Sequence, residues 1–221
     1  TRMAFTVAAN DTILVGIMDI SPGIGIVNLD AYVYNGIGPA ILLENPTNVA
    51  WKLTINGIVF SDVGDGIALI DPPPLPTPVL VSSVTVGVEG EVGGFLSGIF
   101  AAHATNVTNA GYIAGGDDGI IQKGSGNFTI SNTATGEIQG FDLSGIFLDT
   151  GATGIHTITN AGIIGGGGFG FAIESLSAAG TNKVSNSGTL LGGLSFLGSS
   201  DSITNTGKFK PQVNLSGQGL R

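Results

Sequence analysis

The chain has 221 residues, of which 38 are glycine and only 10% are charged, whereas 42% are hydrophobic. This composition excludes a disordered acidic tail, and the lack of a Gly-X-Y period excludes collagen. A net charge of −9 argues against a nucleic-acid partner or an anionic membrane surface, because both need a basic patch, and the absence of cysteine excludes disulfides, Cys-based zinc sites and thiol nucleophiles.

No segment is predicted to cross a membrane. The longest apolar stretch, residues 12–29, contains Asp19, Pro22 and three glycines, and therefore indicates strands and turns. The first five residues lack the features of a signal peptide. We expect the chain to be a mature form or an excised segment.

Residues 1–52 are expected to form an N-terminal cap and the first irregular turns of a repetitive structure. Short runs such as residues 12–15 and 23–27 are typical of strands, but they match the later repeat only weakly. Terminal repeats are often atypical because they close an exposed core. Trp51, the only tryptophan, is expected to plug that core.

Residues 53–221 are expected to form the repeats themselves, beginning with a first clear turn at residues 53–70. A proline-rich segment follows at 71–78, with five prolines in eight residues. Proline cannot donate to a strand ladder and favours an extended conformation. This segment is therefore predicted to be a loop that leaves the body of the repeat.

One seven-residue pattern recurs at residues 107–113, 158–164, 184–190 and 203–209. Each copy has the form apolar–Thr/Ser–Asn–small–Gly, and the glycines recur about every two dozen residues. We expect these glycines to sit at sharp corners with positive φ. The equivalent glycines along the chain are Gly57, Gly90, Gly111, Gly136, Gly162, Gly188 and Gly207.

These repeats predict an all-β fold, a single-stranded parallel β-solenoid of about seven clear turns plus the N-terminal cap. Strands of three to five residues cannot form a stable sheet alone, and no window of 11 residues lacks Gly and Pro while keeping a helical period. Stacking each turn on the previous one, about 4.8 Å away, gives a rod on the order of 40 Å long.

Five asparagines share one phase of the repeat and are predicted to form a structural ladder. Stacked amides can hydrogen-bond along the axis from one turn to the next. The alternative is that they bind a sugar or calcium. They are Asn109, Asn132, Asn160, Asn186 and Asn205.

The repeat written Ile-Thr-Asn-Ala-Gly-Ile-Ile-Gly-Gly-Gly at residues 158–167 resembles those of Gram-negative autotransporter passengers and related surface adhesins. These belong to the right-handed parallel β-helices, the group that includes pectate lyases, and the resemblance covers about residues 53–210. It implies a secreted rod displayed on the surface of a Gram-negative bacterium.

A second resemblance concerns the Gly-Asp-Asp segment at residues 116–118, which is similar to that of polygalacturonases. The resemblance implies a glycoside hydrolase in which Asp117 and Asp118 act as acid and base and Lys123 meets an acidic sugar. The Gly-His-Gly and Arg-x-Lys motifs of those enzymes are absent, and Gly-Asp-Asp-Gly is also ordinary turn chemistry.

Acidic pairs in turns could instead hold a structural calcium ion, with Asp62, Asp65, Asp117 and Asp118 as candidate ligands. No other cofactor is expected. His103 and His156 have no nucleophile signature beside them, and each is expected to be a surface residue in a turn.

The leading functional expectation is therefore a non-enzymatic extracellular rod, adhesin-like or structural. Its partners would be a host or neighbouring-cell surface, or copies of itself joined end to end through unpaired strands. The alternative is a polysaccharide-active enzyme that uses Asp117 and Asp118.

Overall fold

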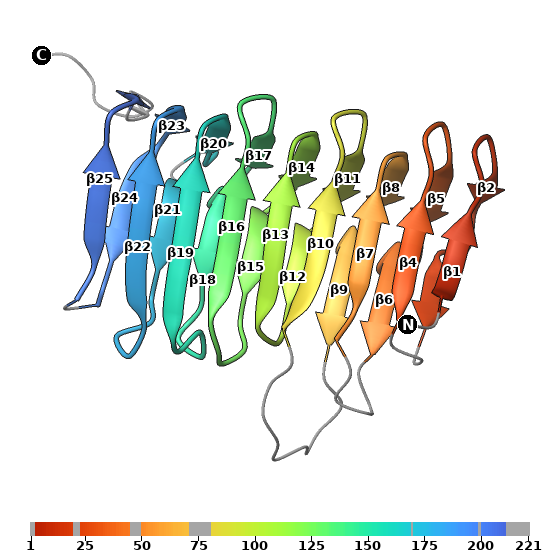
Figure 1. Cartoon of the computed structure of the whole chain (residues 1–221), viewed down its shortest axis with the longest axis horizontal. Helices are drawn as coiled ribbons and strands as arrows, with labels where there is room; N and C mark the ends of the chain where they lie inside the picture. Colours follow the sequence, from red (N-terminus) through yellow and green to blue (C-terminus); the bar gives the residue numbers. More distant parts are fainter. Residues whose placement is uncertain are drawn as a thin grey trace, which may run out of the picture.

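The computed structural model describes residues 3–19, 23–44, 50–70, 81–168, 170–198 and 200–210. Within these residues all regular structure is β-strand, arranged in three parallel sheets that we call A, B and C. Each turn of the chain passes through A, then B, then C, and pairs in parallel with the turn before it (Figure 1). This arrangement confirms the predicted parallel β-solenoid. The proline-rich segment 71–78 lies outside the described residues.

Sheet A consists of β1 (Met3–Val7), β4 (Ile24–Val27), β7 (Lys52–Ile55), β10 (Ser82–Val86), β13 (Thr105–Asn109), β16 (Phe128–Asn132), β19 (Ile155–Asn160), β22 (Thr181–Asn186) and β25 (Ser202–Asn205). Sheet B consists of β2 (Thr12–Ile13), β5 (Tyr32–Asn35), β8 (Ile58–Ser61), β11 (Glu91–Gly94), β14 (Tyr112–Gly115), β17 (Glu137–Gly140), β20 (Ile163–Gly165), β23 (Thr189–Leu191) and β26 (Lys208–Lys210). Sheet C consists of β3 (Ile17–Asp19), β6 (Ile41–Glu44), β9 (Ile67–Ile70), β12 (Ser97–Ala101), β15 (Asp118–Gln122), β18 (Ile146–Leu148), β21 (Phe171–Ser175) and β24 (Gly193–Phe196).

The nine strands of sheet A span eight inter-strand steps, which corresponds to a rod about 38 Å long. Residues from β7 onward supply six three-strand turns and a last turn with two described strands. Residues 3–44 supply β1 to β6, which continue the same three sheets as two further turns (Figure 1).

The interior is filled by columns of equivalent side chains, one from each turn. In sheet C the column is isoleucine from Ile17 to Ile173 and ends at Leu194, and its members from Ile41 to Ile173 are fully buried. Trp51 is also fully buried and lies beside Ser82 in the interior, as a plug would. Period-2 alternation places these residues inside the coil on every turn.

The corner between sheets A and B changes chemistry along the rod. On the first four turns its inward position is aliphatic, occupied by Val7, Val27, Ile55 and Val86. From the fifth turn the same position is asparagine, and each side-chain amide donates to the side-chain oxygen of the next asparagine. The Nδ2–Oδ1 distances are 2.9, 2.7, 2.7 and 2.6 Å along the series Asn109, Asn132, Asn160, Asn186 and Asn205.

The asparagine side chains also form hydrogen bonds with backbone groups. Asn132 Nδ2, for example, also donates to the carbonyl oxygens of Gly136 and Ile163, and Gly111 N donates to Asn109 Oδ1. The first four asparagines are buried, so their amide groups bond to one another in place of water. They do not present these groups to a ligand at the surface.

The corner glycines correct one expectation from the sequence. Gly111 and Gly162 are not among the residues with positive φ; those glycines are Gly16, Gly126, Gly154, Gly168 and Gly192. A Cβ on Gly162 would instead lie 2.1 Å from the carbonyl oxygen of Gly136 in the preceding turn. These corners therefore require glycine because successive turns pack too closely for a side chain.

Candidate functional site

Asp117 and Asp118 lie where the chain enters β15, at the corner between sheets B and C. Asp118 is only 4% exposed, and its Oδ1 accepts a hydrogen bond of 2.8 Å from the backbone N–H of Ser144 in the next turn. Asp117 is half-buried and lies just outside the strand. The two carboxylates thus occupy different environments, with Asp118 engaged as a cap for a backbone donor.

The same corner repeats this arrangement two turns earlier. Asp65 accepts hydrogen bonds from both the backbone N–H and the hydroxyl of Ser97, which is the first residue of β12. In the later turns Ser144 also donates its hydroxyl to Glu174 Oε2 at 3.0 Å. The acidic residues of this corner therefore satisfy strand-end donors, which explains their recurrence without any ligand.

Burial raises the pKa of two aspartate carboxyl groups at this corner. It raises the pKa of Asp118 to about 6, against the opposing hydrogen bond from Ser144, and the nearby charges of Asp117 and Glu174 add to the rise. Burial likewise raises the pKa of Asp65, opposed by its bonds from Ser97. Asp118 alone would suit a proton donor near neutral pH, but its carboxylate has almost no access to solvent.

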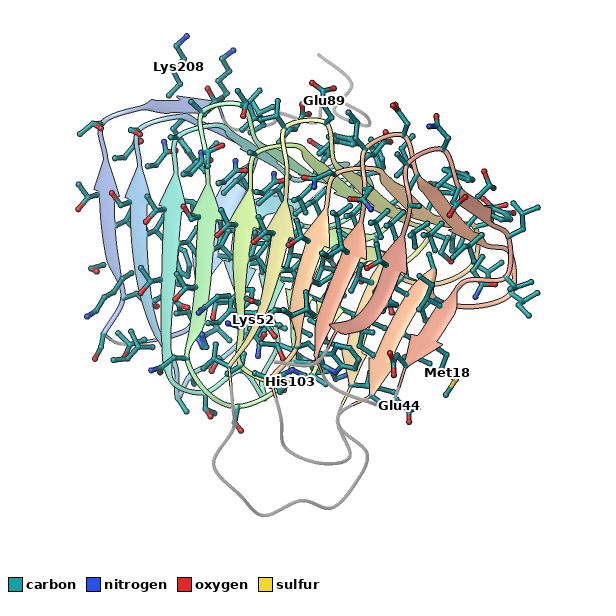
Figure 2. All side chains as sticks on the ribbon, turned by 45° about the vertical axis from the view of Figure 1, so that its right-hand side comes forward. Met18, Glu44, Lys52, Glu89, His103 and Lys208 are labelled. Carbon is teal, nitrogen blue, oxygen red and sulfur yellow. The ribbon has the colours of Figure 1, made fainter. Side chains whose placement is uncertain are left out.

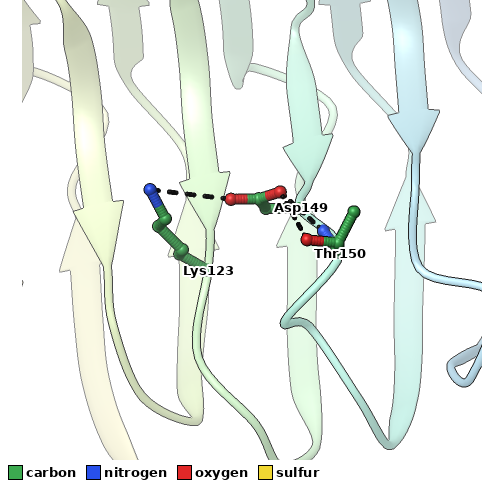
Figure 3. A network of polar contacts seen from close by, with 3 residues as sticks. All are labelled: Lys123, Asp149 and Thr150. Atoms are coloured by element: carbon green, nitrogen blue, oxygen red, sulfur yellow. Dashed lines mark hydrogen bonds and ion pairs between the residues drawn. The ribbon is translucent and has the colours of Figure 1, made fainter.

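Lys123 does not join this corner. It follows the opposite end of β15, five residues and therefore about 16 Å from Asp118 along the strand. Its Nζ lies 3.7 Å from Asp149 Oδ2, and Asp149 also accepts bonds from the backbone and hydroxyl of Thr150 (Figure 3). The structure thus separates Lys123 from the carboxylate pair of the glycosidase hypothesis.

The four candidate calcium ligands do not converge on one point, and three of them already accept hydrogen bonds from other residues. Tyr34 donates its hydroxyl to Asp62, and this bond raises the pKa of Tyr34. Asp65 is held by Ser97, and the pair Asp117–Asp118 lies two turns further along the rod. Among the described residues no group of three or more acidic, histidine or cysteine side chains has the geometry of a metal site.

The two histidines are buried, so the expectation of surface residues is wrong. His103 is 2% exposed, and its Nε2 lies 2.8 Å from the hydroxyl of Ser82. The same hydroxyl oxygen accepts a hydrogen bond from the backbone N–H of Trp51. His156 is fully buried, with Nε2 2.8 Å from the Ala152 carbonyl oxygen. A Ser–His pair without solvent access cannot act on a substrate. Sequence patterns could not reveal this pair, because 21 residues separate its members.

His156 begins a buried polar stack that the sequence analysis missed. It pairs in register with Asn182, whose backbone and side-chain amides both donate to Asp201 Oδ1. Burial lowers the pKa of His156, while the Ala152 carbonyl and the charge of Asp201 oppose that shift. The signal available in the sequence was the shared repeat phase of these three residues at the start of sheet A strands.

No family model, curated protein or solved structure matches this chain. The likeness to autotransporter passengers and pectate-lyase-like proteins consequently rests on the repeat pattern, and the structure supports its coarser part, a parallel β-solenoid. The described residues contain no helix that is long and apolar enough to cross a membrane.

Proposed function

We propose that this chain is a non-enzymatic, extracellular rod that adheres to surfaces through the outer face of sheet A. The observation that carries the proposal is a column of hydroxyl side chains on that face. Eight of its nine successive positions are threonine or serine, and Ile26 is the exception. The eight are Thr6, Thr54, Thr85, Thr108, Ser131, Thr159, Ser185 and Thr204.

The backbone fixes the spacing of this column. Neighbouring members lie about 4.8 Å apart because each occupies the same position on adjacent strands. Thr85, Thr108 and Thr159 are exposed, and the parallel outward column is also mostly uncharged, with Ser83, Asn106, Thr129 and Thr157 between Lys52 and Lys183. A broad polar face with few charges suits many weak hydrogen bonds to a neutral, hydroxyl-rich surface such as a cell-surface polysaccharide.

The non-enzymatic part of the proposal is supported by the state of the candidate catalytic groups. Asp118 caps a backbone donor inside a corner, and Lys123 pairs with Asp149 at the other end of the strand. The raised pKa of Asp118 keeps a polysaccharide-active enzyme as the second candidate, since a carboxyl group that titrates near pH 6 is a usable acid.

A binding assay on immobilised neutral polysaccharides and on whole cells tests the proposal. Replacing Thr85, Thr108 and Thr159 with lysine should abolish binding, whereas lysine at Thr12 and Thr189 on the outer face of sheet B should leave it intact. Circular dichroism establishes that both sets remain folded. Binding that survives the sheet A substitutions and disappears with those on sheet B would overturn the assignment of the face.

A surface location on a Gram-negative bacterium follows from the same proposal, with a host or neighbouring cell as the partner. End-to-end association of copies would lengthen the adhesive face, because the outer column of sheet A would continue from one copy to the next. Electron microscopy of concentrated protein would show such filaments, and isolated rods at every concentration would argue against them.

A further inference from the structure

A second outward face of the rod has the opposite chemistry to sheet A. On sheet C one outward position is apolar on six consecutive turns, in a column formed by Met18, Leu42, Ala68, Phe100, Ile121 and Phe147. We call it the apolar column. Met18 is 66% exposed, and Leu42, Phe100, Ile121 and Phe147 are half-buried. Ala68, the one small member, is only 3% exposed and forms a low point in the column between Leu42 and Phe100. The column then ends, because the next two turns carry Glu174 and Ser195.

The neighbouring corner extends this apolar surface. Large side chains stand exposed where sheet B passes into sheet C, with Phe95 at 61% and Phe141 at 56%. Val63, Leu96 and Leu143 are exposed at the same corner. Asp62, Asp117 and Asp142 lie among them at this corner, so the apolar surface is continuous along the column and interrupted by carboxylates at its edge. Exposed large apolar side chains gathered on one face indicate an interaction site.

We propose that this face pairs with the same face of a second copy, giving a dimer of antiparallel rods. The two-fold axis runs parallel to the strands and passes between β9 and β12. It places the six positions of the apolar column opposite one another in reverse order. Phe100 of each copy then lies over the low point at the buried Ala68 of the other, between that copy's Leu42 and Phe100.

The remaining positions of the column also match in this arrangement. Leu42 faces Ile121 and Met18 faces Phe147, so every contact is apolar. At the corner, Val63 faces Leu96. Two sheets packed face to face with interdigitated side chains is a common solution for burying such surfaces.

The charges beside the apolar column are complementary under the same symmetry. The adjacent outward position on sheet C is Glu44, Ile70, Ala102, Lys123 and Asp149 on five successive turns. Lys123 lies 3.7 Å from Asp149, but its side chain is still 61% exposed and can face a second carboxylate. The two-fold axis sets Glu44 of one copy opposite Lys123 of the other, twice per dimer, and Ile70 opposite Ala102. Figure 2 shows Met18 and Glu44 projecting from neighbouring parts of the same surface. A net charge of −9 would otherwise repel a second copy, but the apolar column itself carries none.

The dimensions suit a moderate affinity. The apolar column spans five inter-strand steps, about 24 Å, and the strands beneath it are about 13 Å long. The column alone thus covers about 300 Å², and even with the exposed corner side chains the face is smaller than the roughly 800 Å² per partner of a standard interface. We expect dissociation in the micromolar range rather than an obligate dimer.

Sedimentation velocity over a concentration series tests the proposal. The wild-type chain should shift reversibly from monomer to dimer. Phe100→Glu should abolish the dimer, whereas Ile163→Glu on the outer face of sheet B should not change it. A chain that stays monomeric at every concentration overturns the proposal, as does a dimer that tolerates Phe100→Glu, or an apolar column that binds neutral lipid vesicles in place of a second copy.

Charge reversal keeps the proposal falsifiable if Phe100→Glu fails to fold. Glu44→Lys and Lys123→Glu should each weaken the dimer about tenfold, and the double variant should restore it, because the two exposed pairs are then rebuilt with reversed polarity. End-to-end association would not respond to these reversals, because Glu44 in β6 and Lys123 after β15 lie on the side of the rod and not at its ends.

Discussion

The side chain of Asn132 donates its amide to Asn160 Oδ1 across neighbouring turns, at 2.7 Å. The Asn160 amide in turn donates to Asn186 Oδ1, also at 2.7 Å, and to the Thr189 carbonyl oxygen. Each turn thereby fixes the register of the next through buried polar groups that have no access to water.

Replacing Asn160 with alanine should lower the free energy of unfolding by about 2–4 kcal/mol, because Asn186 Oδ1 loses its ladder donor and a small cavity remains. Asn106→Ala is the matched control, since Asn106 is exposed on the outer face of sheet A, and its effect should stay within about 0.5 kcal/mol. Urea denaturation measures both. Equal effects would show that the ladder adds nothing beyond a surface amide.

Gly162→Ala should destabilise the rod by about 2–4 kcal/mol, because the new methyl group meets backbone carbonyl oxygens of Gly136 and Thr133 at 2.1 and 2.3 Å. Gly38→Ala is the control. A Cβ at Gly38 meets only Asn35 Nδ2 at 3.7 Å, so this substitution should be neutral or slightly stabilising. Thermal unfolding distinguishes the two, and a neutral Gly162→Ala would refute the close-packing explanation of the corners.

Asp118 should make the protein less stable as pH rises from about 4 to about 6. Its pKa is raised to about 6 in the folded chain, so the unfolded chain releases this proton first and is favoured as pH increases through that window. The loss should approach about 2–3 kcal/mol.

Asp118→Asn tests this assignment because it keeps an oxygen that can accept the bond from the Ser144 N–H but cannot titrate. Relative to wild type, the variant should gain stability between pH 4 and pH 6 and hold that gain above it. Unfolding free energies that run parallel for the two proteins across this range would contradict the raised pKa.

The titration of His156 should change the free energy of unfolding with pH in the direction opposite to that of Asp118. Burial lowers its pKa below the ordinary value of 6.5, so the unfolded chain binds the proton more readily and stability falls as pH drops below about 6.5. His156→Gln should remove this acid sensitivity. In an Asp118→Asn background, where the opposing titration is absent, unfolding measured at several pH values between 5 and 7 should show the effect most clearly; an unchanged slope would rule it out.

The repeat phase was enough to predict the solenoid and the row of asparagines. A pattern such as Ile158-Thr159-Asn160 recurs at fixed spacing, and equivalent positions must stack when each turn lies on the last. The repeat phase did not predict why the corners need glycine. A local pattern suggests a positive φ, and it does not reveal that a Cβ would collide with a backbone carbonyl of another turn.

The apolar column of sheet C could not be predicted for a different reason. Its members stand next to buried isoleucines in pairs such as Ile99-Phe100 and Ile146-Phe147, so the sequence shows a continuous apolar run without alternation. Such a run does not say which residue points outward. The burial of Asp118 and His156 was hidden as well, since both lie in glycine-rich, turn-like segments that resemble surface loops.

The most direct test of the proposed function is to incubate the intact chain with neutral and acidic polysaccharides and to measure binding and new reducing ends in the same samples. The proposal predicts binding that depends on Thr85, Thr108 and Thr159 and no new reducing ends. Reducing ends that accumulate with the wild-type chain and vanish with Asp118→Asn would contradict it and establish an enzyme.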